Sequence, residues 1–250
     1  MTVSTHSPEP GVAVVTVDAP PVNALTGPGW FALADAITRA GRDPATHVVV
    51  LRAEGRGFNA GVDIKEIQRD PGHEALIGAN EGCAAAFAAV YDCAVPVIAA
   101  VQGFCLGGGV GLVGNADVVV ASEDARFGLP EVDRGALGAA THLTRLVPQH
   151  LMRALYYTAD TISAEQLHHH GSVYAVVPRA DLDETARDLA RRIAAKDTRV
   201  IRAAKQAING IDVQAVHRSY RFEQGFTFQL NLAGVSGAAR RKFLDGEAMS

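Results

Sequence analysis

The sequence has little cysteine, and near its start it has no basic segment followed by an apolar one. Its three cysteines, Cys83, Cys93 and Cys105, cannot all pair, and none stands in a CxxC motif or a cysteine–histidine spacing typical of zinc ligands. This pattern excludes a disulfide framework and indicates no metal site, so we expect a reduced, cytoplasmic protein without a metal ion. Residues 1–10 do not have the pattern of a signal peptide.

The chain also has no excess of positive charge, and its net charge of −4 gives no reason to expect two classes of partner. Nucleic acids and anionic membrane surfaces bind extended basic patches. The basic residues here occur in short groups such as Arg191-Arg192, which are typical of solvated helix faces. With 48% hydrophobic and 20% charged residues in 250, the composition is that of a soluble globular protein with a core of ordinary size.

One stretch, residues 95–113, is apolar and long enough to cross a bilayer, with Gln102 as its polar interruption. Pro96 and a series of glycines favour another interpretation, a buried strand followed by a tight turn and a short helix. A second apolar run that ends at Val120 is then the next strand. We therefore expect no membrane span.

The turn in this stretch contains three consecutive glycines, Gly107, Gly108 and Gly109. Without Cβ atoms, the backbone can adopt restricted angles and a ligand can press directly against it. If a helix starts there, its first N–H groups point outward with the positive end of the helix dipole and can hold a negative oxygen. Close packing alone would explain the triplet equally well. A second glycine-punctuated loop, residues 54–66, offers bare backbone in the same way.

Strands and helices alternate in the first two thirds of the chain, and helices dominate the last third, which predicts an α/β fold. We expect strands at 12–17, 48–52, 95–101, 116–120 and 173–177, with a short strand and turn at 125–132. We expect helices at 28–40, 74–93, 137–147 and 151–158, another beginning after Ser163, and a helical pattern from residue 182 onward. Thr26 and Ser163 are the expected caps.

We interpret residues 1–190 as the core of the fold and residues 191–250 as a helical extension of the same unit. The extension carries the aromatic residues Tyr220, Phe222, Phe226 and Phe228 on one long helical run. Apolar side chains in a terminal helix need something to pack against. We therefore expect a partner subunit.

Several motifs follow one another along the chain. They are Asn59-Ala60-Gly61-Val62-Asp63-Ile64-Lys65-Glu66, Pro96 to Gly103 with the glycine triplet, Ala116-Asp117, Phe127-Gly128-Leu129-Pro130-Glu131, Arg145-Leu146 and Thr161-Ile162-Ser163-Ala164. In order and spacing they resemble the motifs of the crotonase superfamily, which contains the enoyl-CoA hydratases and isomerases. The likeness covers roughly residues 11–232.

This resemblance implies a crotonase-type spiral of ββα units with a helical C-terminal trimerisation region, in a homotrimer or a dimer of trimers. It also implies an acyl-coenzyme A thioester as substrate and no separate cofactor. The superfamily's oxyanion hole, matched by motif, consists of the backbone N–H groups of Val62 and Gly108. Such donors each stabilise a developing enolate by roughly 3–4 kcal/mol. The resemblance places further contacts to substrate or coenzyme A at Ala60, Gly61, Asp63, Ile64, Lys65, Gly107 and Gly109.

The motifs differ from those of a standard hydratase at one position. Hydratases of this superfamily carry one glutamate two residues after the glycine triplet and a second in the Pro-Glu pair, whereas this chain has Gly111 and Glu131. Addition of water to a double bond needs one group to activate the water and another to supply the α-proton. We therefore expect no efficient hydratase.

The segment after Glu131 supplies two more candidates for catalysis, Asp133 and His142. His142 is a candidate for a base that activates water, oriented by Glu131 or Asp133. It is equally interpreted as a histidine bonded to backbone at the edge of the core. Asp133 is also interpreted as the ion-pair partner of Arg134. Candidates for contacting the phosphates of coenzyme A are Lys65, Arg240, Arg241 and Lys242.

Three hypotheses remain open. A superfamily branch that lost the first glutamate cleaves carbon–carbon bonds in cyclic β-diketone thioesters by a retro-Claisen reaction, and the chain most resembles the members of that branch that act in actinobacterial steroid degradation. The leading hypothesis is therefore an acyl-CoA hydrolase that opens a carbocyclic ring in steroid catabolism. The second is an enoyl-CoA hydratase or isomerase that uses Glu131 as its sole carboxylate. The third is a non-catalytic protein that binds acyl-CoA.

Overall fold

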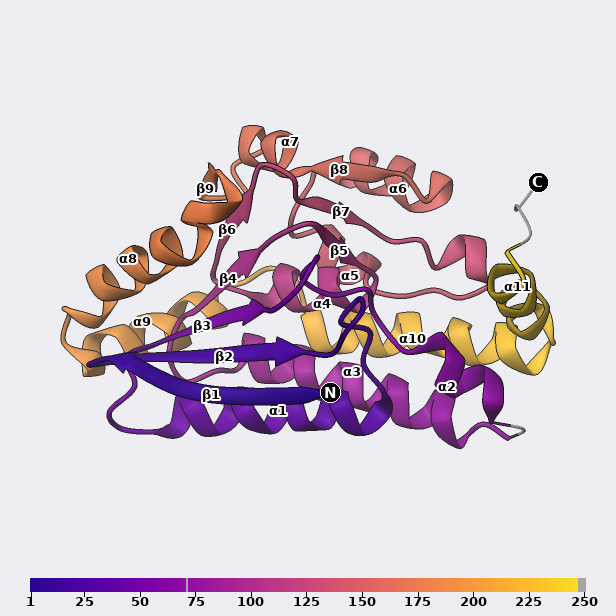
Figure 1. Ribbon diagram of the computed structural model, residues 1–250, viewed down its shortest axis with the longest axis horizontal. Coiled ribbons are helices and arrows are strands. Elements are labelled where there is room, and N and C mark those ends of the chain that lie inside the picture. Colours follow the sequence, from indigo (N-terminus) through magenta and orange to yellow (C-terminus); the bar gives the residue numbers. More distant parts are fainter. Residues whose placement is uncertain (71, 247–250) are drawn as a thin grey trace.

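The computed structural model describes residues 1–70 and 72–246, so the last four residues of the predicted extension lie outside it. Its centre is a six-stranded sheet in the order β1-β2-β3-β4-β6-β9 (Figure 1). The strands are β1 (Thr2–Glu9), β2 (Val12–Asp18), β3 (Val48–Ala53), β4 (Val97–Val101), β6 (Val118–Ser122) and β9 (Ala175–Val177). Within this sheet, β1 pairs antiparallel with β2, and the other described pairs of neighbouring strands are parallel. The inner strands are rich in valine and buried on both faces, which is typical of a parallel sheet covered by helices.

Residues 1–70 and 72–246 contain eleven α-helices and two short 3₁₀ helices. They are α1 (Gly27–Arg42), α2 (Ile64–Arg69), α3 (Glu74–Tyr91), α4 (Gly108–Asn115), η1 (Val132–Arg134), α5 (Ala140–Leu143), α6 (Gln149–Thr158), α7 (Ala164–His169), η2 (Arg179–Asp181), α8 (Leu182–Ala194), α9 (Thr198–Gly210), α10 (Val216–Leu232) and α11 (Val235–Leu244). Both predicted caps are confirmed: Thr26 accepts a hydrogen bond from the N–H of Gly29, and Ser163 forms a capping box with Gln166.

Alternate residues of the sheet pack against different helices, as the two-residue period of a strand requires. On one face, Val14, Val50 and Ile98 pack against α8. On the other face, the neighbouring residues Val15 and Leu51 join the larger core with α1, α3 and α4. Helices α1 and α3 run side by side along this second face (Figure 1).

A smaller sheet of three strands stands beside the large one, in the order β5-β7-β8. Its strands are β5 (Phe104–Leu106), β7 (Arg126–Gly128) and β8 (Thr161–Ser163). Strand β5 ends directly before the glycine triplet, and β7 ends three residues before Glu131. This sheet therefore carries both segments to the same side of the molecule.

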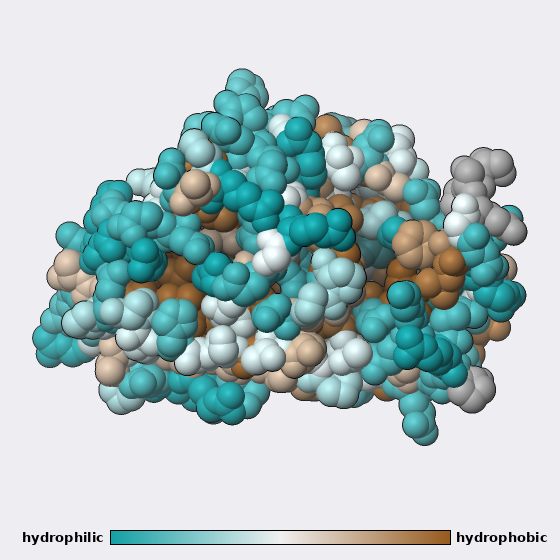
Figure 2. Space-filling model, in the orientation of Figure 1, coloured by the Kyte–Doolittle hydropathy of each residue, from teal (hydrophilic) through white to brown (hydrophobic). Residues whose placement is uncertain are grey.

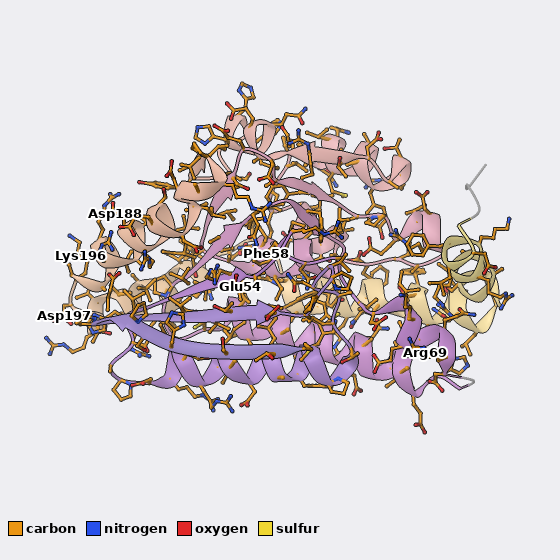
Figure 3. All side chains as sticks on the ribbon, viewed as in Figure 1. Glu54, Phe58, Arg69, Asp188, Lys196 and Asp197 are labelled. Atoms are coloured by element: carbon orange, nitrogen blue, oxygen red, sulfur yellow. The ribbon has the colours of Figure 1, made fainter. Side chains whose placement is uncertain are left out.

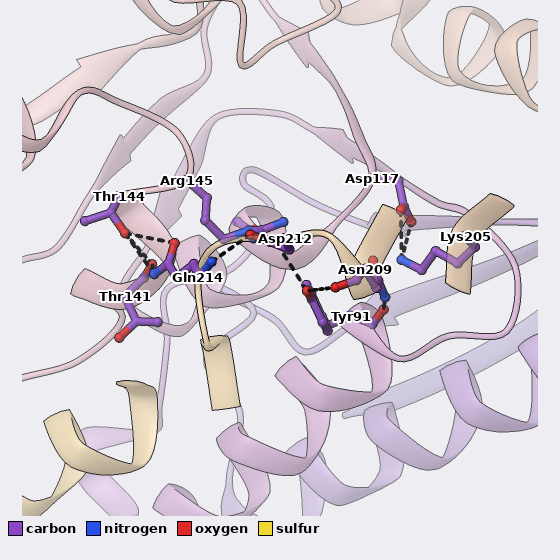
Figure 4. A network of polar contacts seen from close by, with 10 residues as sticks. Tyr91, Asp117, Thr141, Thr144, Arg145, Lys205, Asn209, Asp212 and Gln214 are labelled. Carbon is purple, nitrogen blue, oxygen red and sulfur yellow. Dashed lines mark hydrogen bonds and ion pairs between the residues drawn. The ribbon is translucent and has the colours of Figure 1, made fainter. Parts of the chain in front are cut away.

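The C-terminal helices are tied to the core by a chain of buried and half-buried polar contacts (Figure 4). The Nζ atom of Lys205 in α9 lies 2.7 Å from a carboxylate oxygen of Asp117. Asp212, between α9 and α10, pairs with Arg145 and accepts a hydrogen bond of 3.1 Å from the hydroxyl of Tyr91. These contacts hold α9 and the segment before α10 against the core.

The predicted helix at 137–147 is wrong, because only the four residues of α5 are helical there. Ala139 has a φ of 59°, a left-handed conformation that interrupts a helix. Residues 135–139 instead form an irregular segment before α5. Strand β1 was not anticipated from the sequence. Among the described residues, no helix is long and apolar enough to cross a membrane.

Candidate active site

Asn59 joins the loop between β3 and α2 to the segment before the glycine triplet. Its side chain is fully buried; it donates to the carbonyl of Asn23 at 2.6 Å and accepts from the N–H of Gly61 at 2.8 Å. Its own backbone carbonyl accepts from the N–H of Leu106 at 2.8 Å. These three bonds fix the position of the loop relative to β5.

Gly61 and Gly108 lie against each other where the two loops meet. Gly61 has a φ of +86°, and a Cβ atom on it would lie 3.2 Å from the backbone nitrogen of Gly108. A Cβ atom on Gly108 would lie 2.7 Å from the ring of the buried Trp30. Both positions therefore require glycine, one for its backbone angles and both for space.

The backbone N–H groups of Val62 and Gly108 are free donors where the two loops meet. Gly108 is the first residue of α4, so its N–H has no partner within the helix. Neither N–H donates a hydrogen bond within residues 1–70 and 72–246. Two such donors side by side can hold a negatively charged oxygen.

Both residues line a largely apolar cavity with an empty volume of about 830 Å³, including its opening to solvent. Its walls come from α2, α3, the segment after β7, α10 and α11. In Figure 2, apolar residues surround a hollow in the region that α2 and α11 border. The cavity is of the size that small-molecule sites have.

Glu131 is the only carboxylate among the described residues that line this cavity. Its Oε1 occupies the space that a side chain on Gly107 would need, which places it beside the glycine triplet. Its Oε2 is buried and has no hydrogen-bond partner in the described part of the protein. Burial, assisted by the charge of Glu223 and opposed by that of Arg134, raises the pKa of Glu131 to about 8. A carboxyl group with such a pKa can act as a base or an acid near neutral pH.

His142, by contrast, does not line this cavity. It is 1% exposed and packs against the rings of Phe87 and Tyr220, at centroid distances of 4.9 and 5.0 Å. Neither ring nitrogen has a hydrogen-bond partner within the described residues, so neither Glu131 nor Asp133 orients the imidazole. Burial lowers the pKa of His142 to about 3, so the ring is neutral at physiological pH.

The remaining predicted residues are divided between the cavity and its supports. Ala60, Gly61 and Ile64 line the cavity. Asp63 caps α2 by accepting from the N–H groups of Lys65 and Glu66.

The side chains of Lys65 and Asp133 are exposed, and within the described chain no ion pair joins Asp133 to Arg134 as the sequence had suggested. Gly109 packs against the carbonyl oxygen of Asn59. It therefore supports the loop and does not line the cavity.

Two residues that line the cavity, Cys83 in α3 and Tyr220 in α10, were not among the candidates for the site. They come from segments far away in the sequence, where no motif marks them. Arg134, considered as an ion-pair partner of Asp133, and Arg240, a candidate for contacting the phosphates of coenzyme A, also line the cavity.

Among residues 1–70 and 72–246, no group of three or more histidine, cysteine, aspartate or glutamate residues is placed to hold a metal ion. The charged side chains that line the cavity are Glu131, Arg134 and Arg240.

Comparison with known proteins shows to which family the chain belongs. Residues 8–228 match the family model of enoyl-CoA hydratase/isomerase. The chain belongs to the enoyl-CoA hydratase/isomerase family. An enoyl-CoA hydratase/isomerase from Xanthobacter autotrophicus Py2, 27% identical, shares the fold with a TM-score of 0.86 over 97% of this chain and 91% of that one. The crotonase-type fold expected from the motifs is thus confirmed.

Two family members are far more similar in sequence. One, from Rhodococcus jostii (strain RHA1), is 72% identical over 94% of this chain and 91% of its own length. The other, from Mycobacterium tuberculosis (strain ATCC 25618 / H37Rv), is 68% identical over 98% of this chain and 99% of its own. Both are (7aS)-7a-methyl-1,5-dioxo-2,3,5,6,7,7a-hexahydro-1H-indene-carboxyl-CoA hydrolases.

Proposed function

We propose that this protein is a coenzyme A thioester hydrolase that opens a carbocyclic ring, acting on the hexahydroindene-carboxyl-CoA named for its two similar relatives. The identity of 72% and 68% over nearly the whole chain supports this substrate. The observation in the structure that supports it best is a cavity with one carboxylate, Glu131, beside two free backbone N–H groups.

In the proposed reaction, Glu131 removes a proton from water, whose oxygen forms a bond to the carbon of a ring ketone. The adduct collapses, and the carbon–carbon bond of the ring breaks. Its electron pair is delocalised into the thioester as an enolate, whose oxygen accepts hydrogen bonds from the N–H groups of Val62 and Gly108. Glu131 then returns the proton to carbon, which leaves a carboxylic acid where the ketone had been. One carboxyl group with a pKa of about 8 can perform both proton transfers.

Double-bond isomerisation also needs a single base, so it is the second candidate. The same cavity would support it if Glu131 moved a proton between two carbon atoms of an enoyl-CoA. The isomerase hypothesis predicts solvent deuterium in a shifted, unhydrolysed product. Ring opening predicts instead a product heavier than the substrate by one water.

The proposed experiment incubates the purified protein with the bicyclic diketone thioester in H₂¹⁸O and follows the product by mass spectrometry. Ring opening places one ¹⁸O atom in the new carboxyl group. We expect Glu131→Gln to lower the rate by about 10²–10⁴-fold, the usual contribution of a positioned acid–base group. Rapid hydration of crotonyl-CoA without ring opening would overturn the proposal.

We also propose a cytoplasmic homotrimer or dimer of trimers, with residues 1–190 as the catalytic core and the helices of residues 191–250 at the subunit contacts. Large apolar side chains such as Phe222, Phe226 and Leu232 are exposed on α10 in the single chain, which supports this role. Sedimentation velocity would detect an assembly of three or six chains of 26.2 kDa. A stable monomer would exclude it.

A further inference from the structure

The proposed ring opening creates negative charge on two oxygen atoms in turn. The thioester oxygen is charged when the enolate forms, and Val62 and Gly108 can receive that charge. The oxygen of the attacked ketone is charged earlier, in the adduct with water, and the same group finally becomes a carboxylate. Hydration and isomerisation of an enoyl-CoA create charge on the thioester oxygen alone. A cavity built for ring opening therefore needs a second electropositive group.

Arg134 is such a group. It lines the cavity one turn after Glu131, and no carboxylate within the described residues pairs with its guanidinium. Its Nε is buried without a hydrogen-bond partner in the described chain, and its Nη1 has a single long contact of 3.5 Å to the carbonyl of Pro130. A half-buried cation without a hydrogen-bonded carboxylate partner can bind the negative charge of a ligand in the cavity.

An aromatic residue outside the cavity holds the Arg134 side chain in place. Its guanidinium lies 4.1 Å from the centre of the Phe243 ring of α11. A planar guanidinium stacked on an aromatic ring keeps its N–H edge free for a carbonyl or carboxylate oxygen. Burial lowers the pKa of Arg134, but an arginine stays protonated at neutral pH.

Arg240 faces the same cavity but is already bonded to neutral groups. Its Nε donates to the side chain of Gln68 at 3.3 Å, and its Nη1 donates to that of Asn231 at 2.8 Å. It was a candidate for contacting the phosphates of coenzyme A, and its place near α2 is compatible with that role. The two arginines therefore have different surroundings: within the described chain, Arg134 has a buried N–H without a hydrogen-bond partner, and Arg240 does not.

We propose that Arg134 binds the oxygen of the ring ketone that water attacks and afterwards holds the carboxylate that ring opening creates. This inference rests on the proposed hydrolase function. It makes Arg134 a catalytic residue for the ring-opening step and the residue that selects acyl groups with a ketone at that position.

The test compares Arg134→Met, Arg134→Lys and wild type in three measurements: the rate of ring opening, inhibition by the ring-opened carboxylate product, and the affinity for a saturated acyl-CoA that has no ring ketone. We expect Arg134→Met to slow ring opening about a hundredfold, as loss of an oxyanion donor does, and to weaken product inhibition at least tenfold. Its affinity for the saturated acyl-CoA should stay within about threefold. Arg134→Lys should recover part of the rate, because it restores the charge without the planar fork.

The matched control is Arg69→Met, which removes an exposed arginine of α2 (Figure 3) and should change none of the three measurements. Equal rates of ring opening by wild type and Arg134→Met would overturn the role of Arg134 alone. Arg134→Met would also overturn it by weakening the binding of the ring-opened product and of the saturated acyl-CoA to the same extent. Such a result would indicate that Arg134 binds coenzyme A or that the variant is misfolded. Absence of ring opening by wild type would overturn the proposed function itself.

Discussion

The ring of Phe87 occupies the space in which a side chain at position 111 would begin. A Cβ atom on Gly111 would overlap the outer edge of that ring. Edge-to-face contacts with Trp30 and His142 hold Phe87 there, with 5.8 and 4.9 Å between the ring centroids. The position at which similar hydratases carry their first glutamate is therefore filled from α3, and no rotamer of a longer side chain at 111 avoids the collision at its first atom.

This relationship predicts how substitutions at the two positions combine. Gly111→Ala should destabilise the protein by about 1–3 kcal/mol, because it overpacks a core that has no room. Phe87→Ala alone should cost about 3–5 kcal/mol through the cavity that it leaves. In the double variant, the alanine at 111 no longer meets the ring, so its added cost should fall near zero. Denaturant titration of the four proteins measures the coupling, and strict additivity would contradict it.

The raised pKa of Glu131 predicts the pH dependence of activity. As the proposed base, Glu131 acts in its ionised form, so kcat/KM for ring opening should rise with pH to a plateau, with a midpoint near 8. The measurement is a pH–rate profile from pH 6 to 10 with the bicyclic thioester. A flat profile over that interval would show that Glu131 is not the base.

The same group predicts an opposite trend in stability. The folded protein keeps Glu131 protonated up to a pKa of about 8, whereas the unfolded chain ionises it near 4.5. Wild type therefore loses free energy of unfolding, relative to Glu131→Gln, as pH rises from 4.5 to 8. We expect the variant to be more stable above pH 8, by up to a few kcal/mol, and similar at pH 4. Thermal or denaturant unfolding at several pH values tests this, and a constant difference would contradict it.

The packing of His142 predicts that it is dispensable for chemistry. His142→Leu keeps an apolar contact to Phe87 and Tyr220, so the rate of ring opening should stay within a few-fold of wild type. Because burial lowers the pKa of His142 from 6.5 to about 3, wild type should lose stability as pH falls through this interval, and the variant should lose less. A loss of activity of 10²-fold or more in a folded variant would restore His142 as a base.

Glu223 is predicted to stabilise the segment that borders the cavity. Its carboxylate accepts from the N–H groups of Ala140 and Thr141 at 2.8 and 3.1 Å, at the start of α5. Glu223→Ala leaves these buried donors without partners, which should cost about 1–3 kcal/mol or more and lower activity indirectly. The exposed Glu81 of α3 provides the control, since Glu81→Ala should stay within about 0.5 kcal/mol. Equal stability of the two variants would contradict this role.

The contact between the two loops predicts that a substitution at Gly61 lowers activity more than one at Gly55. Gly55 and Gly61 both have a positive φ, but a Cβ atom on Gly55 meets nothing within 4 Å, whereas one on Gly61 lies 3.2 Å from the nitrogen of Gly108. Alanine should cost roughly 1–2 kcal/mol of stability at either site. Only Gly61→Ala should also displace the donors of the proposed oxyanion hole and reduce ring opening by 10²-fold or more. Equal activity of both variants would argue against Val62 and Gly108 as donors.

The sequence by itself was enough to predict the α/β class and the crotonase-type fold. Buried strands and capped helices leave local patterns, and the glycines of both loops stand at positions where the backbone leaves no alternative. Gly61 and Gly108 could therefore be recognised by motif, and Glu131 by its place after Pro130. Gly111 has no side chain, and this indicated that the second carboxylate is missing.

The tertiary structure decided which of the candidates share one cavity. His142 and Glu131 are eleven residues apart, but the left-handed turn at Ala139 and the packing of Phe87 place the imidazole behind an aromatic wall. Whether the half-buried Arg134 has a hydrogen-bonded carboxylate partner likewise depends on side chains from distant segments such as α10 and α11, which no local pattern specifies. Burial and electrostatic partners arise from contacts between distant segments, and these contacts exist only once the chain is folded.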